Sequence, residues 1–172
     1  GNLKAEVLYA WSKDMTLLIL YRGESDDDTL FSPTNHAYFN LNGHDSGSVS
    51  RHVLWVDSER ITNKDPSNVP DGTFMDVKDT VFDFSNPATL GPTMTDPNPQ
   101  LLSSSGLDQN YCLKTSHETI SRVASLKDPA SGRVMEVLTN FPGLQIYTGN
   151  HIGGTFGKSG NEYMDYGGVC LE

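Results

Sequence analysis

The histidines are the side chains of this sequence best suited to proton transfer near neutral pH. His36 differs from the others because it lies within residues 34–41 (TNHAYFNL), among amides and aromatic rings. Such surroundings can tune the pKa of an imidazole and let a ring stack on the face of a sugar. The same pattern also fits a core histidine bonded to neighbouring amides, so the local residues leave both interpretations open.

The histidine spacing does not indicate a metal site. His36, His44 and His52 follow one another at intervals of eight residues, and His117 and His151 lie further along the chain. Histidine ligands on strands usually come as His-x-His or stand close to a cysteine or carboxylate. None of these intervals provides that pattern, so we expect no metal.

Residues 153–159 (GGTFGKS) contain the last part of a phosphate-binding loop without its spacing. Ile152 stands where that motif requires its first glycine, and the residues that follow carry no helical pattern. We therefore expect a turn here and no nucleotide site.

The two cysteines, Cys112 and Cys170, lie far apart and lack the CxxC or CxxH partners that a zinc site uses. We expect them to be small buried side chains of a protein in a reducing compartment, without a disulfide. The sequence therefore predicts a cytoplasmic location.

The composition excludes two classes of partner. The 172 residues include 12 basic and 22 acidic side chains, for a formal charge of −10. This charge repels phosphate backbones and anionic lipid, and no stripe of Lys and Arg opposes it. No window approaches the ~20 apolar residues of a membrane span, and the first residues do not resemble a secretion signal. We expect neither nucleic acid nor a membrane as a partner.

The hydrophobic pattern favours strands throughout. Residues 7–11 and 16–21 flank a short polar turn, and residues 121–127 and 133–139 flank a turn with Pro and Gly, which predicts two hairpins of half-buried strands. Further strands are expected at residues 53–57, 111–114 and 144–147. Since no window of eleven or more residues keeps a helical stripe, the chain is predicted to be nearly all β.

One domain is expected over residues 1–172. The proline-rich segment 86–105 resembles a linker, but the pieces on either side are too small and too poor in strands to close a sheet alone. We therefore expect a long surface loop across one sandwich.

Four blocks of the sequence resemble the aldose 1-epimerase (galactose mutarotase) family. Residues 34–41 are similar to its TNHxYFNL block, and residues 106–111 (GLDQNY) to its G-[FL]-D-x-x-[FY] block. Residues 141–150 (FPGLQIYTGN) resemble PGxQxYTGN, and residues 167–172 (GGVCLE) resemble the GxxLE segment. Four blocks in the family's order imply an all-β fold, the galactose-mutarotase-like β-supersandwich.

The resemblance also implies a reaction and the residues that carry it. It makes His36 the general acid and Glu172 the general base. Four further residues are implied to bind the substrate: Asp108, Gln145, Asn35 and Tyr38, with the rings of Phe39 and Tyr147 as further apolar faces. Anomers of a free hexose such as galactose or glucose interconvert when a base removes the C1 hydroxyl proton and an acid protonates the ring oxygen. No cofactor or metal is required.

The family also carries an upstream block, with an arginine and a second histidine in an LHGG-like context, that has no counterpart in this sequence. We therefore expect the C-terminal portion of a supersandwich, without its N-terminal strands, inactive by itself and prone to self-association through exposed sheet edges. Two alternatives stay open. One is a hexose-6-phosphate 1-epimerase, which needs cationic side chains around the phosphate, and the other is a catalytically silent sugar-binding module.

Overall fold

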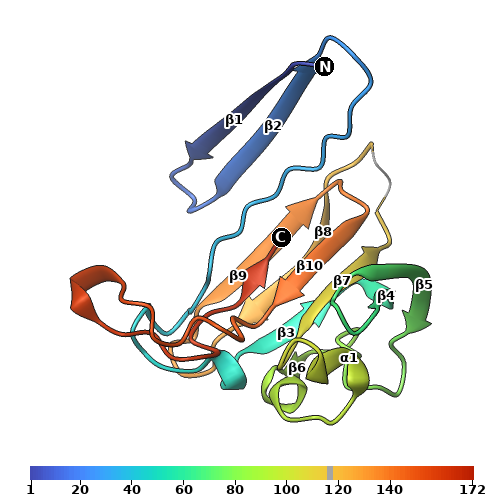
Figure 1. Ribbon diagram of the computed structural model, residues 1–172. Coiled ribbons are helices and arrows are strands. Elements are labelled where there is room, and N and C mark those ends of the chain that lie inside the picture. Colours follow the sequence, from blue (N-terminus) through green and yellow to red (C-terminus); the bar gives the residue numbers. More distant parts are fainter. Residues whose placement is uncertain (116–117) are drawn as a thin grey trace. The chain divides into compact units, whose positions relative to one another are not determined.

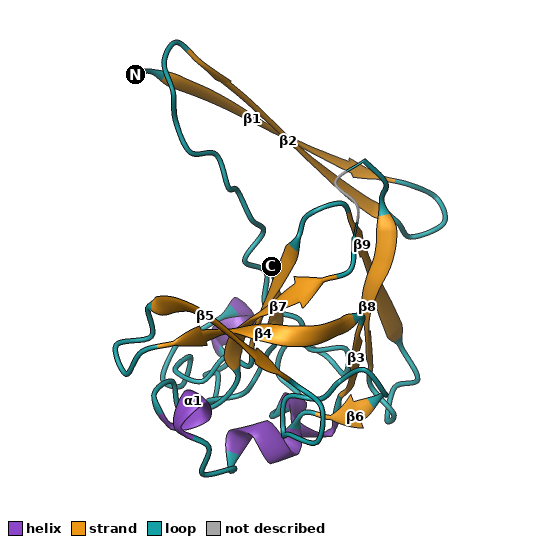
Figure 2. Ribbon diagram, turned by 90° about the vertical axis from the view of Figure 1, so that its right-hand side faces the viewer, coloured by secondary structure: helices purple, strands orange, loops and turns teal. Residues whose placement is uncertain are grey.

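The computed structural model describes residues 1–115 and 118–172, which form two compact units, residues 1–35 and residues 36–172. Strands make up most of the regular structure, and the helices are short (Figure 2). This confirms the prediction of a nearly all-β chain. Among the described residues, no helix has the length and apolar character that crossing a membrane requires.

The first unit is an antiparallel hairpin of β1 (Leu3–Trp11) and β2 (Leu17–Ser25). The predicted hairpin is confirmed, with both strands longer than expected. Its large apolar side chains are exposed, as Trp11 with 70% of its surface accessible illustrates. The expectation of half-buried strands is therefore wrong for this unit, because a two-stranded ribbon has no second layer of its own to cover a face.

The second unit contains two antiparallel sheets (Figure 1). The first has the order β11-β10-β7-β4-β5, with bounds Cys170–Leu171, Gly143–Tyr147, Asp108–Leu113, Ser58–Lys64 and Pro70–Asp76. The second has the order β6-β3-β8-β9, with bounds Ala88–Thr89, Val53–Val56, Ser121–Lys127 and Val134–Thr139. The second predicted hairpin, β8–β9, is confirmed, as are the strands predicted near β3, β7 and β10.

Short helices connect the strands of the second unit. They are η1 (Val49–Arg51), η2 (Gly91–Met94), α1 (Pro99–Leu102) and η3 (Lys158–Gly160). The proline-rich segment 86–105 carries β6, η2 and α1, and it buries Leu90 and Leu101 in the core. The expectation of a long surface loop is thus corrected. Removing these apolar side chains from water lowers the free energy of the folded state, so the segment packs into the core.

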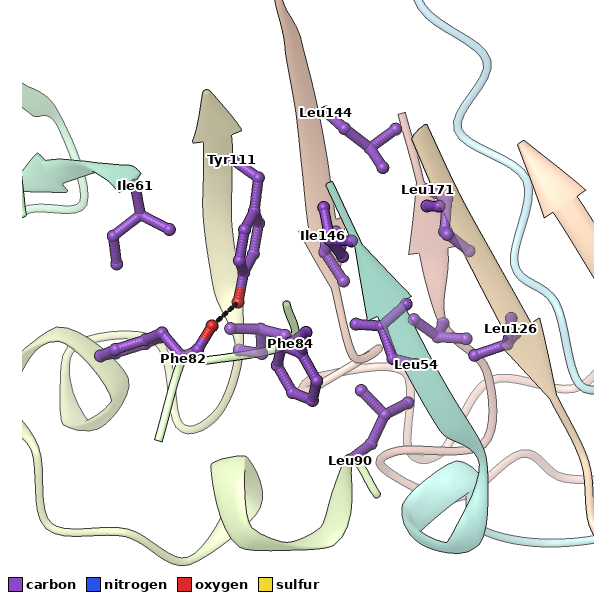
Figure 3. Close-up of a cluster of buried hydrophobic side chains, with 14 of the residues drawn as sticks. Leu54, Ile61, Phe82, Phe84, Leu90, Tyr111, Leu126, Leu144, Ile146 and Leu171 are labelled. Atoms are coloured by element: carbon purple, nitrogen blue, oxygen red, sulfur yellow. Dashed lines mark hydrogen bonds between the residues drawn. The ribbon is translucent and has the colours of Figure 1, made fainter. Parts of the chain in front are cut away.

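The two sheets share one hydrophobic core (Figure 3). Leu54 of β3 and Leu126 of β8 meet Ile146 of β10 and Tyr111 of β7, all fully buried. The buried Tyr111 hydroxyl donates a hydrogen bond of 3.2 Å to the Phe82 carbonyl, so its polar end is satisfied. Each such side chain contributes about 1.5–3 kcal/mol through burial, which anchors the strands that carry the candidate site.

Candidate active site

The five-stranded sheet has one apolar and one polar face at β7, β10 and β11. Leu144, Ile146 and Leu171 join the core, whereas Gln145 and Glu172 occupy alternate positions on the same chain segments. Successive side chains of a strand point to opposite faces, so burying the leucines and isoleucine directs the polar residues outward. The alternation thereby collects the functional groups on one surface.

His36 reaches this surface because its segment pairs with the edge of the sheet. Phe39 and Val169 form an antiparallel bridge through two backbone hydrogen bonds of 2.8 and 2.9 Å. Continuing that register by three residues in each direction places His36 opposite Glu172. Gly168 permits the close approach, since an added Cβ there would lie 3.1 Å from the Tyr38 Cβ.

His36 and Glu172 form a paired imidazole and carboxylate. His36 Nε2 lies 3.4 Å from Glu172 Oε1, with 51% of the imidazole side chain and 10% of the carboxylate side chain exposed. Reciprocal backbone hydrogen bonds of 2.9 Å join Glu172 to Gln145 and hold the carboxylate in place. Burial raises the pKa of Glu172 above its ordinary value, the charge of His36 opposes this effect, and the charge of Asp108 adds to it.

Asp108 and Gln145 form a second polar pair on the same face. The Gln145 Nε2 amide donates a hydrogen bond of 2.7 Å to Asp108 Oδ1. Gly106, two residues before Asp108, has a φ of +146°, and an added Cβ would lie 2.5 Å from Asn150 Oδ1. The turn that delivers Asp108 therefore requires glycine, because an L side chain would be strained and would clash.

Two tyrosines surround the imidazole. The rings of His36 and Tyr38 stack with centroids 5.2 Å apart, and Tyr147 approaches both rings edge-on at 6.1 Å. Tyr38 follows His36 by two residues and so lies on the same face, whereas Phe39 packs against the hydrophobic core. Phe39 is partly buried there, and its role as an apolar face toward a sugar stays a prediction.

Sequence reasoning missed two contributors to this surface. Cys170 is buried beside Glu172, and burial raises the pKa of its thiol to about 12. The buried Lys64 ammonium donates hydrogen bonds to Ser104 Oγ at 2.8 Å and to the Asp108 carbonyl at 3.0 Å. Burial lowers the pKa of Lys64. Lys64 lies outside the four blocks, and Cys170 occupies a position of the 167–172 block to which the resemblance assigns no role, so both became visible only through packing. Cys112 and Cys170 are free, which confirms the expectation that they form no disulfide.

Asn35 and the histidines other than His36 have the following partners. Asn35 belongs to the first unit, where its side-chain amide donates a hydrogen bond of 3.1 Å to Tyr9 Oη. His44 meets the Tyr163 hydroxyl at 3.2 Å, and buried His52 accepts a hydrogen bond from the Leu41 backbone. His151 is exposed, and His117 lies outside the described residues. The substrate-binding role of Asn35 stays a prediction.

These features define an antiparallel β-sandwich protein with a paired imidazole and carboxylate beside a carboxylate–amide pair. The sequence model described as "Aldose 1-epimerase" matches residues 1–172. The chain belongs to the aldose 1-epimerase family, as its four sequence blocks indicated.

Curated relatives agree with this assignment. The galactose mutarotases of Homo sapiens and Mus musculus are each 37% identical to the chain, and the alignments cover 100% of this chain and 48% of theirs. An aldose 1-epimerase of Escherichia coli K12 is 30% identical, with 100% and 49% covered. The chain thus spans about half the length of the curated relatives it matches.

Solved structures share the fold. A galactose 1-epimerase from Lactobacillus acidophilus NCFM superposes with a TM-score of 0.82 at 28% identity, covering 99% of this chain and 48% of that one. An aldose epimerase homologue from C. elegans gives a TM-score of 0.81 at 23% identity, covering 98% and 49%, and is similar in fold. The galactose-mutarotase-like sandwich predicted from the sequence is confirmed, with about half of that architecture represented here.

Proposed function

We propose that this chain carries the acid and base of an aldose 1-epimerase, which interconverts the α and β anomers of a free hexose such as galactose or glucose. The observation that carries the proposal is the 3.4 Å approach of His36 Nε2 to Glu172 Oε1 beside the Asp108–Gln145 pair. The names of the relatives, galactose mutarotase and aldose 1-epimerase, support the same reaction.

The reaction moves two protons, one from the C1 hydroxyl oxygen and one to the ring oxygen that is also bonded to C1. Glu172 takes the proton of the C1 hydroxyl while His36 gives a proton to the ring oxygen, and the bond between C1 and that oxygen breaks. The resulting aldehyde rotates about its bond to C2 and closes again with the two roles reversed. Since the hydroxyl oxygen and the ring oxygen are both bonded to C1, an acid and a base in mutual contact suit both transfers.

The local electrostatics fit a reversible proton transfer. Burial raises the pKa of Glu172, which makes the ionised carboxylate a stronger base toward a hydroxyl. The exposed half of His36 leaves its imidazole accessible to substrate. An imidazole nitrogen donates when it carries a proton and accepts when it does not, so the same ring can serve in successive steps.

Four residues are proposed to hold the sugar. Asp108 and Gln145 offer an acceptor and donors to hydroxyls, and a carboxylate forms the stronger, charge-assisted contact. Tyr38 places an aromatic ring beside the imidazole, where it covers sugar C–H groups. Asn35 remains in the proposal through the family resemblance.

We further propose that activity requires more of the family's architecture than these 172 residues, which align with 48% of the human relative. In this proposal residues 1–172 belong to one domain, the C-terminal part of the sandwich, and the protein is cytoplasmic. Exposed strand edges of the separate chain then favour self-association.

The two alternatives have less support. A phosphorylated sugar needs a free cation, but the buried Lys64 ammonium is already bonded to Ser104 and to the carbonyl of Asp108. A silent sugar-binding module would not need an imidazole in contact with a carboxylate whose pKa is raised.

Polarimetry of freshly dissolved α-D-galactose tests the proposal, using the protein as the cell makes it and the 172-residue chain beside it. We expect faster mutarotation than in buffer for the cellular form, and little acceleration by the 172 residues alone. Saturable galactose binding without acceleration in either form would overturn the epimerase proposal in favour of the sugar-binding module.

A further inference from the structure

A third chemically reactive side chain lies beside the proposed acid and base. One ring nitrogen of His36, the Cys170 Sγ and a carboxylate oxygen of Glu172 all lie within 4.8 Å of one another. This is the only group of three or more His, Cys, Asp or Glu side chains in metal-binding proximity within residues 1–115 and 118–172. The proposed reaction uses His36 and Glu172 but not the thiol, so the position of Cys170 beside them is not explained by that reaction.

Pairing on both sides of β11 brings the three side chains together. Cys170 and Glu172 are two residues apart, so they share one face of the strand. Cys170 pairs with Tyr147 of β10 on one side, and the bridge from Phe39 to Val169 brings the His36 segment along the other. The backbone that carries the three groups is therefore held by hydrogen bonds before any ligand arrives.

The distances approach those of a tetrahedral metal centre. With bonds of about 2.0–2.3 Å, tetrahedral ligand atoms lie about 3.3–3.7 Å apart. His36 Nε2 and Glu172 Oε1 are already 3.4 Å apart. Since every separation is at most 4.8 Å, a movement of at most about 1 Å brings the sulfur of Cys170 to the third corner. The fourth corner remains for water or a sugar oxygen.

The ligand chemistry selects a class of cation. Thiolate and imidazole favour Zn²⁺ and its softer congener Cd²⁺, whereas Mg²⁺ and Ca²⁺ require oxygen ligands. A thiolate, a carboxylate and a neutral imidazole together carry two negative charges, which one divalent cation balances. Binding forms the sulfur–metal bond and releases the thiol proton to solvent, so no oxidant or reductant takes part.

We propose that His36, Cys170 and Glu172 form an inhibitory binding site for a divalent cation of the Zn²⁺ and Cd²⁺ class. The bound cation occupies the lone pairs of the imidazole and carboxylate that proton transfer needs. Inhibition therefore rests on the proposed function, whereas binding of the cation does not. This inference departs from the expectation of no metal site, which rested on the spacing of the histidines along the chain and not on the side chains that the fold brings together.

Titration with Cd²⁺ tests the site directly, because a thiolate bound to Cd²⁺ absorbs in the ultraviolet. We expect one equivalent of Cd²⁺ to produce this absorption, and Mg²⁺ at the same concentration to produce none. Cys170→Ser should abolish the absorption. Cys112→Ser is the matched control, since Cys112 is the other free cysteine and belongs to no such group within the described residues, and it should leave the absorption unchanged.

A second variant covers the case in which Cys170→Ser fails to fold. His36→Ala changes a half-exposed side chain and should weaken Cd²⁺ binding by about tenfold or more, as measured by calorimetry. No thiolate absorption in the unaltered protein, or the same absorption after Cys170→Ser, would overturn the proposal. Equal affinity after His36→Ala would also overturn it, because the imidazole would then be no ligand.

An activity measurement separates this inference from the proposed function. Zn²⁺ or Cd²⁺ should slow galactose mutarotation, a chelator should restore it, and Cys170→Ser should remain active in the presence of the cation. If mutarotation is absent without any cation, the proposed function fails while the absorption titration still decides the site. If mutarotation is present and insensitive to both cations, the inhibitory site is disproved.

Discussion

The two faces of the five-stranded sheet are built from the same strands, yet they carry different tasks. On one face Tyr111, Leu144 and Ile146 are buried in the core, with at most 3% of their surface accessible. On the other face Glu172 and Gln145 keep polar groups together at the surface of the second unit. Alternation within a strand thus couples a stable support to a chemical surface one residue away.

The comparison shows that buried residues, which contact no ligand, hold the side chains of the polar face in position. Glu172 is held by reciprocal backbone bonds to Gln145, and the neighbouring residues Leu144, Ile146 and Leu171 fix those strands by burial. Substitutions on the polar face should therefore change rate, whereas substitutions on the buried face should change stability. The experiments below test this division.

The largest effect is expected on the polar face. In the protein as the cell makes it, Glu172→Gln and His36→Ala should each lower kcat by ~10²–10⁴, because an acid or base contributes mainly in the transition state. Polarimetry gives kcat, and chemical denaturation should show little change in the free energy of unfolding. Glu59→Gln, whose side chain is 76% exposed on β4, is the control. A variant that kept more than half of kcat would remove that residue from its proposed role.

On the buried face, Ile146→Ala should lower the free energy of unfolding by about 2–5 kcal/mol, since it leaves a cavity in the core. The molecules that remain folded should keep their kcat. Leu138 on β9 has 57% of its surface exposed, so Leu138→Ala should lower the free energy of unfolding by less than about 0.5 kcal/mol. Similar losses for both variants would contradict the division between the faces.

Asp108→Asn should have an intermediate effect on catalysis. Replacing a charge-assisted contact by a neutral one should lower kcat/KM about tenfold, with KM and kcat both affected because the contact exists before and during reaction. Asp57→Asn, a half-exposed carboxylate of the same unit that lies 3.8 Å from the Lys114 ammonium, provides the comparison. An unchanged KM would speak against a hydroxyl-binding role for Asp108.

The same variant should shift the pH profile. The charge of Asp108 raises the pKa of Glu172, so its removal should let Glu172 stay ionised to lower pH. Because the base must be ionised, activity is lost as pH falls through its pKa, and this acid limb of kcat/KM should move to lower pH in Asp108→Asn. An acid limb that moves to higher pH would show that a group other than Glu172 controls it.

The smallest effect concerns a buried histidine outside the five-stranded sheet, His52, which follows η1 and precedes β3. Burial lowers the pKa of His52, partly offset by Asp128, so below about pH 6.5 the unfolded chain binds a proton that the folded chain refuses. Stability should therefore fall as pH decreases from about 6.5 toward the lowered value, and His52→Gln should reduce that slope. His44→Gln, an exposed histidine, should keep it. Denaturation curves across this range measure both slopes, and equal slopes would refute the assignment.

Part of the fold was predictable because local patterns decide it. The β8–β9 hairpin has a turn with Pro129 and Gly132, where φ is +74°, between two alternating runs. In contrast, β4 (SERITNK) and β5 (PDGTFMD) were not predicted, since their sequences are polar or contain Pro and Gly. Their pairing with each other and with β7 makes them strands, and tertiary context overrides propensity.

The sequence by itself determined the family, through four ordered blocks, and the all-β class, through alternating short runs. It also named His36, Glu172, Asp108 and Gln145, which the structure brings to one surface. Only the tertiary structure placed Cys170 beside His36 and Glu172 and packed Phe39 against the core. The reason is physical: spacing along a chain reports neighbours within a strand, whereas the partners across strands depend on register, which hydrogen bonding and burial over the whole sheet decide.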